Sequence, residues 1–292
     1  MNTHAHAAWQ ETALSFDVAG DTCVAVLCQP EARPAHACGL LLLVGGPQYR
    51  AGAHRHYVQL AREVASAGHA VLRFDVRGMG DSTGQAAGFE AQDADIEAAL
   101  QALQQHCPAV QRVVLFGLCD GASAAALYAA RQNDARLHAL LLLNPWVRDE
   151  QTLAQTQLKH RYLARLGQAD TWQRLFTGRL GWAALRGWWQ AWRSARRPAN
   201  PPTTTADYRR TMQAGVARVP AWALLSAQDS TAQEFAWAAG QQTEWRSLVQ
   251  RGQLQCLPLP EADHTLGSAL ARQQAAAHVL QLLQQAAGPA PV

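Results

Sequence analysis

The chain has 292 residues, of which 49% are hydrophobic, and a formal net charge of +3 at pH 7. This length is enough for one large α/β domain with an insertion and an ample core. No apolar run approaches the roughly 20 residues that cross a bilayer, and the first residues lack the charged start and apolar stretch of a secretory signal. These features argue against a membrane-spanning or secreted protein, and we expect a cytoplasmic one.

Six cysteines are scattered along the chain without any Cys-x-x-Cys pair. We expect buried, reduced thiols rather than a disulfide framework or a zinc site, and therefore no bound metal. The sequence also lacks the Gly-x-x-x-x-Gly-Lys-Ser/Thr phosphate loop and the dinucleotide fingerprint. We accordingly expect no cofactor.

In chain order, apolar runs of strand length alternate with helical patterns. The runs that predict strands are Thr22–Cys28, Cys38–Val44, Val71–Val76, Val113–Phe116, Leu140–Leu143, Ala221–Ser226 and Leu254–Leu259. The helical patterns are His54–Ala67, Ala91–Gln105, Ala122–Arg131, Thr231–Val249 and Ser268–Gln285. Regular alternation of this kind predicts an α/β fold with a mostly parallel central sheet and helices on both of its faces.

The alternation stops in the middle of the chain, which predicts an insertion. We assign residues 1–146 and 218–292 to the α/β core and residues 147–217 to a helical cap, or lid, above the carboxyl edge of the sheet. Positions 148–217 hold twelve Arg or Lys against four Asp or Glu, a net +8, so the rest of the chain carries −5. This asymmetry marks a separate unit with its own surface role.

The cap is also rich in tryptophan. Its indole rings are those of Trp172, Trp182, Trp188, Trp189 and Trp192. Most are expected to pack the cap onto the core, while Trp188 and Trp189, together with Trp146, are expected to line a substrate-binding, acyl-accepting surface. The positive charge fits a small-molecule or carrier-linked acyl substrate with an anionic part, or peripheral contact with an anionic membrane. Nucleic acid is not expected as a partner, because no recognition motif accompanies the charge.

The fourth predicted strand runs into Gly117-Leu118-Cys119-Asp120-Gly121, which an alanine-rich helical segment follows at once. Strand, tight turn and helix in this order are typical of a nucleophile elbow, with cysteine where serine is usual. The positive end of the helix favours the Cys119 thiolate, whereas Asp120 beside the sulfur opposes it. The competing interpretation is that Cys119 is a small buried hydrophobic residue, as most cysteines are.

Two further residues complete a candidate triad in the order nucleophile, acid, histidine. Asp229 follows the sixth predicted strand, and His264 lies in the loop after the seventh. Cys119 would attack a carbonyl, His264 would take and return the proton, and Asp229 would fix the imidazole tautomer and stabilise its charged form. Glu261 and Asp263 are rival carboxylates, although Asp263 is expected to orient the loop. The alternative for His264 is an ordinary loop histidine.

The segment Asp75–Ser82, at the end of the third predicted strand, is interpreted as structural. Arg77 is expected to pair with Asp75 or Asp81, and the two glycines permit the turn after the strand. We assign no chemistry to this segment.

Four motifs together resemble the α/β-hydrolase family. They are Leu43-Val44-Gly45-Gly46-Pro47, the Asp75–Ser82 segment, the Cys119 elbow and the Asp229/His264 pair, and the resemblance spans residues 20–285. More narrowly, Gly45–Arg50, Gly117–Gly121 and Leu143–Arg148 look like the exosortase A system-associated hydrolases, which are encoded in bacterial exopolysaccharide and protein-sorting (PEP-CTERM) gene clusters. The resemblance implies an α/β-hydrolase fold and a cytoplasmic hydrolase or acyltransferase. A cysteine nucleophile is also similar to the dienelactone hydrolases, whose small uncapped architecture does not match the insertion.

The resemblance further implies an oxyanion hole made of two backbone N–H groups. Asp120 supplies the first donor, directly after the candidate nucleophile. The second is Gly46 or Gln48, because Pro47 between them has no N–H, and we expect Gly46. The family commonly has His-Gly at this turn, and the chain departs from it with Gly45-Gly46.

These features predict a hydrolase that cleaves an ester or thioester through a Cys119–His264–Asp229 triad and an acyl-enzyme. One alternative is acyl transfer on the same triad, because a thioester intermediate passes readily to an alcohol or amine. A second is a non-catalytic binding protein of an exopolysaccharide or protein-sorting system on the same scaffold. A third is a cysteine hydrolase of lactones.

Overall fold

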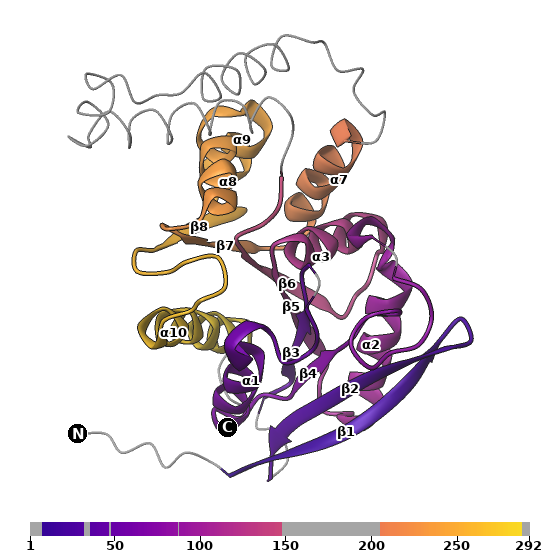
Figure 1. Cartoon of the computed structure of the whole chain (residues 1–292). Coiled ribbons are helices and arrows are strands. Elements are labelled where there is room, and N and C mark those ends of the chain that lie inside the picture. The colour runs from indigo at the N-terminus through magenta and orange to yellow at the C-terminus, as the bar shows by residue number, and fades with distance from the viewer. Residues whose placement is uncertain (1–7, 32–35, 47, 87, 148–204, 288–292) are drawn as a thin grey trace, which may run out of the picture. The chain divides into compact units, whose positions relative to one another are not determined.

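The computed structural model describes residues 8–31, 36–46, 48–86, 88–147 and 205–287, with side chains from 208 to 286 in the last range. These residues form one central sheet of eight strands (Figure 1). From one edge to the other, the strands are β1 (Trp9–Val18), β2 (Asp21–Pro30), β4 (Val71–Phe74), β3 (Cys38–Leu43), β5 (Arg112–Leu118), β6 (Leu137–Leu143), β7 (Ala221–Ser226) and β8 (Leu254–Leu259). The pairs β1–β2 and β2–β4 are antiparallel and all the others are parallel, which confirms the predicted mostly parallel sheet.

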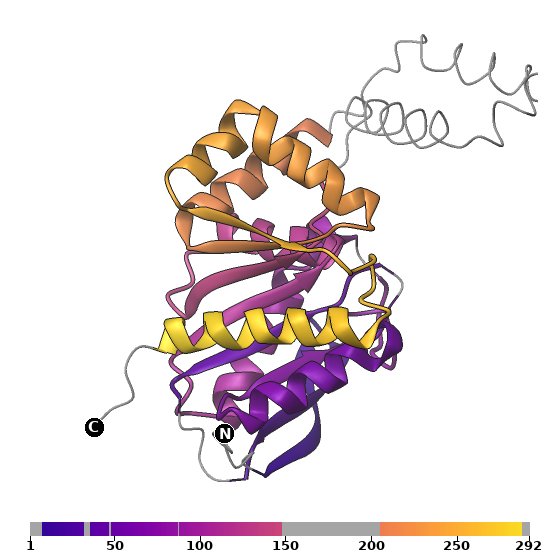
Figure 2. The same cartoon turned by 90° about the vertical axis from the view of Figure 1, so that its left-hand side faces the viewer.

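Helices cover both faces of this sheet, as expected. On one face lie α1 (His56–Ser66) and α10 (Ala269–Ala287), which Figure 2 shows in front of the sheet. On the other lie α2 (Asp93–His106), α3 (Asp120–Arg131), α7 (Thr205–Arg218), α8 (Ser230–Gln241) and α9 (Thr243–Gln250). Short 3-10 turns span Ala53–Arg55 and Phe89–Ala91. The single helix predicted over Thr231–Val249 is wrong, because Gln242 has extended backbone (φ −78°, ψ 131°) that separates α8 from α9.

The central strands are apolar throughout because both of their faces are buried. In β3, Leu41 and Leu43 pack in the core beneath α2 and α3, while Leu40 and Leu42 pack in the core beneath α1. Successive side chains of a strand point to opposite faces, so a strand buried on both sides reads as a continuous hydrophobic run. Because β3, β5, β6, β7 and β8 are parallel, their carboxyl ends lie at one edge of the sheet. The candidate site residues follow β3, β5, β7 and β8 at this edge.

Strand β1 was not predicted. It forms a hairpin with β2 through Ala19 (φ 54°) and Gly20 (φ 90°), the pair of positive φ angles that a tight hairpin turn requires. Most of its side chains are half-buried or exposed, and its sequence alternates polar and apolar residues. Such an edge strand gives a much weaker signal than the buried ones.

Contacts divide the chain into two units, Met1–Val147 with Tyr208–Val292, and Arg148–Asp207. Most of the predicted cap, residues 147–217, with Trp188 and Trp189, lies outside the described residues. Its last part is α7, in which Tyr208, Met212 and Val216 are buried in the core. A Cβ on Gly215 would lie 1.9 Å from the carbonyl oxygen of Ala126, so α7 packs closely on α3. Within the described part of the chain, no helix has the length and apolar character to span a membrane.

Candidate active site

Cys119 occupies the turn between β5 and α3 in a strained backbone conformation. Its φ is 58° and its ψ −120°, a region that costs a non-glycine residue about 1–3 kcal/mol. The turn is held by the Cys119 N–H, which donates to Leu143 O at 2.9 Å, and by the Cys119 carbonyl, which accepts from Ala122 N at 3.1 Å. Surrounding structure thus imposes the geometry that an exposed nucleophile on a strand-to-helix turn needs.

The glycines on either side of Cys119, Gly117 and Gly121, are required because the backbone leaves no room for a side chain at either position. A Cβ on Gly117 would lie 2.4 Å from the carbonyl carbon of Gly121, and a Cβ on Gly121 would lie 2.7 Å from Val44 O. Both contacts are with backbone atoms, which cannot move aside as a flexible side chain can. The Gly-x-Cys-x-Gly spacing is therefore the sequence that this turn demands.

The Cys119 thiol differs from the other five in its surroundings. Cys23, Cys28, Cys38 and Cys107 are buried, while Cys256 and Cys119 are half-buried, and all six are free. Burial raises the pKa of Cys23, Cys38 and Cys107 to about 11, that of Cys28 to about 12, and that of Cys256 above its usual value. Burial thus disfavours the thiolate, which is the nucleophilic form, at these five positions.

His264 joins Cys119 to Asp229. Its Nδ1 lies 2.9 Å from Asp229 Oδ2, and its side chain also makes a hydrogen bond with Cys119. The hydrogen bond with Asp229, and to a smaller extent that with Cys119, raises the pKa of His264 from 6.5 to about 10. The side chain of His264 is 35% exposed and that of Asp229 7% exposed. The imidazole is thus charged at neutral pH, beside a sulfur that it can stabilise as thiolate.

Asp229 has a second role that fixes its carboxylate. It is the N-cap of α8 and accepts hydrogen bonds from Thr231 N at 3.2 Å and Ala232 N at 3.1 Å. An N-cap aspartate satisfies backbone donors that the first turn of a helix leaves free. The same bonds orient the carboxylate toward His264.

The neighbouring carboxylate, Asp263, is committed to the loop itself. Its Oδ1 accepts from Thr265 N at 3.0 Å and from Gly267 N at 2.9 Å. These backbone bonds, that of Gly267 first, lower the pKa of Asp263. As expected, Asp263 orients the loop that carries His264, and it is Asp229 that contacts the imidazole.

Asn144, at the end of β6, is a positioning residue that sequence reasoning missed. It is fully buried with φ 48°, and its Nδ2 donates to His264 O at 3.2 Å and to Ser226 Oγ at 3.0 Å. Its Oδ1 accepts from Ser226 N at 2.9 Å. The available signal was an Asn-Pro pair directly after a buried strand, because asparagine tolerates left-handed backbone and bonds nearby main chain.

The predicted oxyanion donor Gly46 is already engaged by a carboxylate of the protein. Gly46 (φ 61°) donates its N–H to Asp120 Oδ1 at 2.5 Å. Burial raises the pKa of Asp120, while hydrogen bonds from the backbone of Gly46, Asp120 and Gly121 oppose that rise. The two backbone groups predicted to bind an oxyanion thus both favour the Asp120 carboxylate.

The loop that carries Gly46 is anchored by Arg50. The Arg50 N–H donates to Asp75 Oδ1 at 2.6 Å, and its guanidinium pairs with Asp75 and, at 2.6 Å, with Asp81. The expected pairing of Arg77 with Asp75 or Asp81 is therefore wrong. Arg77 instead bonds both oxygens of Asp95 on α2, at 3.1 and 3.0 Å, because its own N–H also donates to Asp95 at 3.0 Å and the turn directs it there.

Trp146 lies directly beside the elbow. Its N–H donates to Cys119 O at 3.3 Å, and its carbonyl accepts from Ser123 Oγ at 2.7 Å. The indole is partly buried and packs against the core. The main chain of Trp146 thus contacts that of the candidate nucleophile, Cys119. Trp188 and Trp189 lie outside the described residues.

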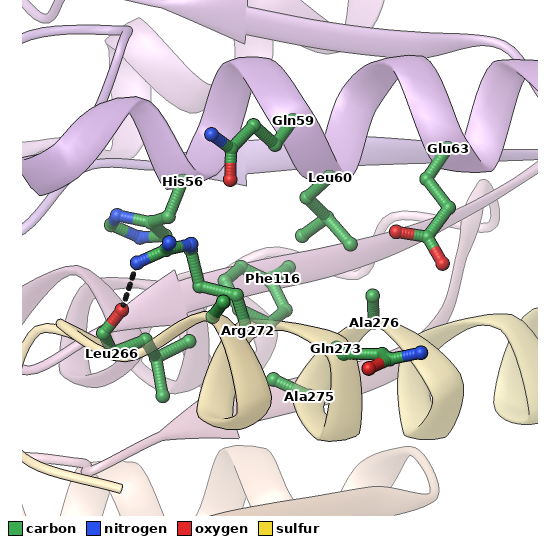
Figure 3. Close-up of a pocket in the computed structure, with 11 residues that line it drawn as sticks. His56, Gln59, Leu60, Glu63, Phe116, Leu266, Arg272, Gln273, Ala275 and Ala276 are labelled. Carbon is green, nitrogen blue, oxygen red and sulfur yellow. Dashed lines mark hydrogen bonds between the residues drawn. The ribbon is translucent and has the colours of Figure 1, made fainter.

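A separate pocket of about 350 Å³ lies between α1 and α10. Figure 3 shows His56 and Arg272 at one end, where Arg272 donates to Leu266 O at 2.9 Å. Burial lowers the pKa of His56 to about 4, so its ring is neutral. Cys119, Asp229 and His264 do not line this pocket. Among the residues that the structure describes, no group of three His, Cys, Asp or Glu side chains could hold a metal ion.

Comparison with known proteins gives a family and a fold. The family model described as "Alpha/beta hydrolase family" matches residues 40–279. No curated protein matches the chain by sequence.

Similar solved structures include the Pyrococcus furiosus esterase Pf2001 (TM-score 0.61, 14% identity, 96% of this chain and 94% of that one). Another is Est1E from Butyrivibrio proteoclasticus with bound ferulic acid (TM-score 0.58, 18% identity, 92% and 98%). A third is the proline iminopeptidase of Mycobacterium smegmatis (TM-score 0.53, 17% identity, 94% and 98%). At these identities the likeness concerns the fold alone.

Proposed function

Because this chain belongs to the alpha/beta hydrolase family and is a hydrolase, we propose that it cleaves an ester or thioester through a Cys119–His264–Asp229 triad. The observation that carries the proposal is the contact of one imidazole with both partners: His264 Nδ1 lies 2.9 Å from Asp229 Oδ2, and the same side chain forms a hydrogen bond with Cys119. An imidazolium held beside a sulfur on a strained turn favours a thiolate, the form of cysteine that attacks acyl carbon.

The reaction proceeds in two halves. In the first, the Cys119 thiolate bonds to the acyl carbon and the imidazolium of His264 gives its proton to the departing oxygen or sulfur. In the second, neutral His264 takes a proton from water as the water oxygen bonds to the acyl carbon. The carbon–sulfur bond then breaks, and thiolate and imidazolium are restored. Asp229 stabilises the charged imidazole, and the N–H groups of Gly46 and Asp120 bind the oxyanion.

Acyl transfer is the second candidate, and the cysteine itself favours it. A thioester intermediate passes readily to an alcohol or an amine, whereas an ester intermediate does so less easily. In this variant the acceptor hydroxyl or amine takes the place of water and gives its proton to His264. Products formed with and without added alcohol or amine distinguish transfer from hydrolysis.

The motifs around the site and the positive charge of the cap both bear on the class of substrate. The resemblance of Gly45–Arg50, Gly117–Gly121 and Leu143–Arg148 to the exosortase A system-associated hydrolases supports a role in an exopolysaccharide or protein-sorting system. The cap, residues 147–217, would select a small-molecule or carrier-linked acyl donor with an anionic part, and Trp146, Trp188 and Trp189 would receive the acyl chain. Six free thiols support a cytoplasmic location. The positive charge of the cap supports peripheral contact with an anionic membrane.

The cap proposal is tested through charge. Replacing Arg193, Arg196 and Arg197 by glutamine is expected to weaken binding of an anionic acyl donor at low salt and to have little effect at high salt, because salt screens the attraction between opposite charges. A neutral donor of the same chain length serves as the control. Unchanged affinity for the anionic donor across all salt concentrations would contradict the proposal.

Selective alkylation tests the triad. Iodoacetamide at pH 7 is expected to label Cys119 at least about tenfold faster than the other five thiols, because their burial disfavours thiolate. His264→Ala should abolish that preference, and Cys256→Ser, which removes the other half-buried thiol, should leave it intact. Intact mass after exposure to acyl thioesters should then show one acyl group, absent in Cys119→Ala. Uniform slow labelling of all six cysteines would instead support a non-catalytic binding protein.

A further inference from the structure

The place where an oxyanion would bind is filled by a side chain of the protein. Asp120 Oδ1 accepts the Gly46 N–H at 2.5 Å, and the backbone of Asp120 and Gly121 also forms hydrogen bonds with this carboxylate. A backbone N–H bonded to a carboxylate makes a shorter and stronger bond than one bonded to a neutral carbonyl. The acyl carbonyl of a substrate must therefore compete with a bound anion.

The packing around the carboxylate shows that the chain is shaped to admit it. A Cβ on Gly45 would lie 2.6 Å from Asp120 Oδ1 and 2.0 Å from Leu118 O, so a side chain at position 45 would exclude both neighbours. Gly46 adopts φ 61°, which turns its N–H toward Asp120. The Gly45-Gly46 pair thus creates the space and the donor that Asp120 uses.

We propose that the Asp120 carboxylate is an intramolecular competitor for the oxyanion hole, which an acyl substrate must displace before Cys119 can form a tetrahedral adduct. The proposal rests on the proposed function. Two negative oxygens at one N–H repel each other, so the carboxylate rotates away as the adduct forms. Substrates with additional contacts to the protein supply the binding energy for this displacement. Asp120 is then a specificity-determining residue that restrains turnover of small, activated esters.

Two reagents separate an effect on the hole from an effect on the thiol. A trifluoromethyl ketone forms a hemithioketal with the cysteine, and its oxyanion needs the hole. Iodoacetamide alkylates the same thiolate without forming an oxyanion. Asp120→Asn keeps the size and a neutral acceptor, and Asp120→Ala removes the competitor, while both retain the backbone N–H at position 120.

Ketone affinity is expected to rise in the order wild type, Asp120→Asn, Asp120→Ala, with the alanine variant about tenfold or more tighter. The iodoacetamide rate at Cys119 should rise by much less than the ketone affinity in both variants, because loss of the Asp120 charge beside the sulfur only modestly favours the thiolate. The kcat/KM for a small activated ester should rise with the ketone affinity. Glu261→Gln is the control, because it removes an exposed carboxylate just before His264 in the chain and should change neither quantity.

The proposal is overturned if either variant binds the ketone no better than wild type, or if alkylation accelerates in parallel, which would place the effect on the thiol. Thermal unfolding of each variant shows whether the fold persists. Asp120→Asn retains a hydrogen-bond acceptor at the start of α3, so it keeps the comparison available if the alanine variant fails to fold. Loss of selective Cys119 alkylation in the wild type would instead contradict the proposed function.

Discussion

The side-chain amide of Asn144 donates a hydrogen bond to the main-chain carbonyl oxygen of His264 at 3.2 Å. The two residues lie 120 positions apart in the chain. The same amide also bonds Ser226, so the ends of β6 and β7 are joined to the loop after β8. The position of the imidazole thus depends on a buried side chain that has no chemical role of its own.

Asn144→Ala is expected to lower the free energy of unfolding by about 2–4 kcal/mol, because buried groups of Ser226 and His264 lose their partners. Urea denaturation measures this change, and the Cys119 alkylation rate reports whether His264 is displaced. Asn144→Gly separates the causes, since glycine adopts φ 48° without strain. Equal loss in both variants assigns the effect to the hydrogen bonds. A stability of Asn144→Ala equal to that of the wild type would contradict the role assigned here.

Gly121→Ala tests the close approach of the elbow to β3. The new Cβ would lie 2.7 Å from Val44 O and 2.8 Å from Leu43 O, so the strand or the elbow must shift. We expect a loss of about 1–3 kcal/mol in unfolding free energy and a slower alkylation of Cys119. The matched control is Gly240→Ala in α8, where no atom lies within 4 Å and alanine should stabilise the helix by about 0.5–1 kcal/mol. Similar effects of the two substitutions would show that the elbow is looser than this packing indicates.

The central strands and the order of the candidate site residues were predictable because each rests on a local pattern. A strand buried on both faces, such as β3 or β5, is a continuous apolar run, and the turn after β5 carries its own glycines. β1 was missed because one of its faces is largely exposed and its polar residues alternate with apolar ones. The break at Gln242 was missed because its one nearby signal, Gly240, lies inside α8 and the helical pattern resumes at once in α9.

Contacts between distant residues could not be predicted in the same way. The Gly46–Asp120 hydrogen bond joins residues 74 positions apart in the sequence. Arg77 pairs with Asp95, although Asp75 lies nearer to it in the sequence. Separation in the sequence does not predict which residues pair, because the turn geometry after each strand determines where a side chain points. The Gly46–Asp120 bond bears on the electrostatics of the candidate site, so the chemistry of the site is less predictable than its location.

Arg50 is expected to stabilise the loop that carries Gly46 through its pairs with Asp75 and Asp81. The Asp75 side chain is 0% exposed, so removing its cationic partner leaves a buried charge. Arg50→Ala should lower the unfolding free energy by about 3–5 kcal/mol. Arg131→Ala is the control, since its 3.5 Å pair with Asp93 is partly exposed and should contribute only about 0–1 kcal/mol.

Chemical denaturation of both variants at one pH measures the contrast. Arg50→Lys adds a further comparison, because a single ammonium cannot bridge two carboxylates as the planar guanidinium does. We expect an intermediate loss for it. If Arg50→Ala and Arg131→Ala lose equal stability, the Arg50 cluster does not anchor the loop.

The pH dependence of His264 provides the most direct check on its contact with Asp229. The folded-state pKa of about 10 lies above the ordinary value of 6.5, so protonation favours the folded chain. That contribution is fully present below about pH 6.5, and it is lost as the pH rises from there through about 10. Asp229→Asn should bring the pKa of His264 down toward 6.5, because the charged partner that contributes most to the rise is removed.

NMR titration of the imidazole nitrogens measures this pKa directly, and urea midpoints at several pH values measure the linked stability. Asp229→Asn should flatten the loss of stability at alkaline pH while retaining the cap of α8, since asparagine caps helices as well as aspartate does. Asp229→Ala should add about 1 kcal/mol of pH-independent destabilisation from the lost cap. Cys119→Ala should lower the His264 pKa by less than Asp229→Asn does. An imidazole that titrates near 6.5 in the wild type would separate His264 from both partners and remove the basis for a thiolate at Cys119.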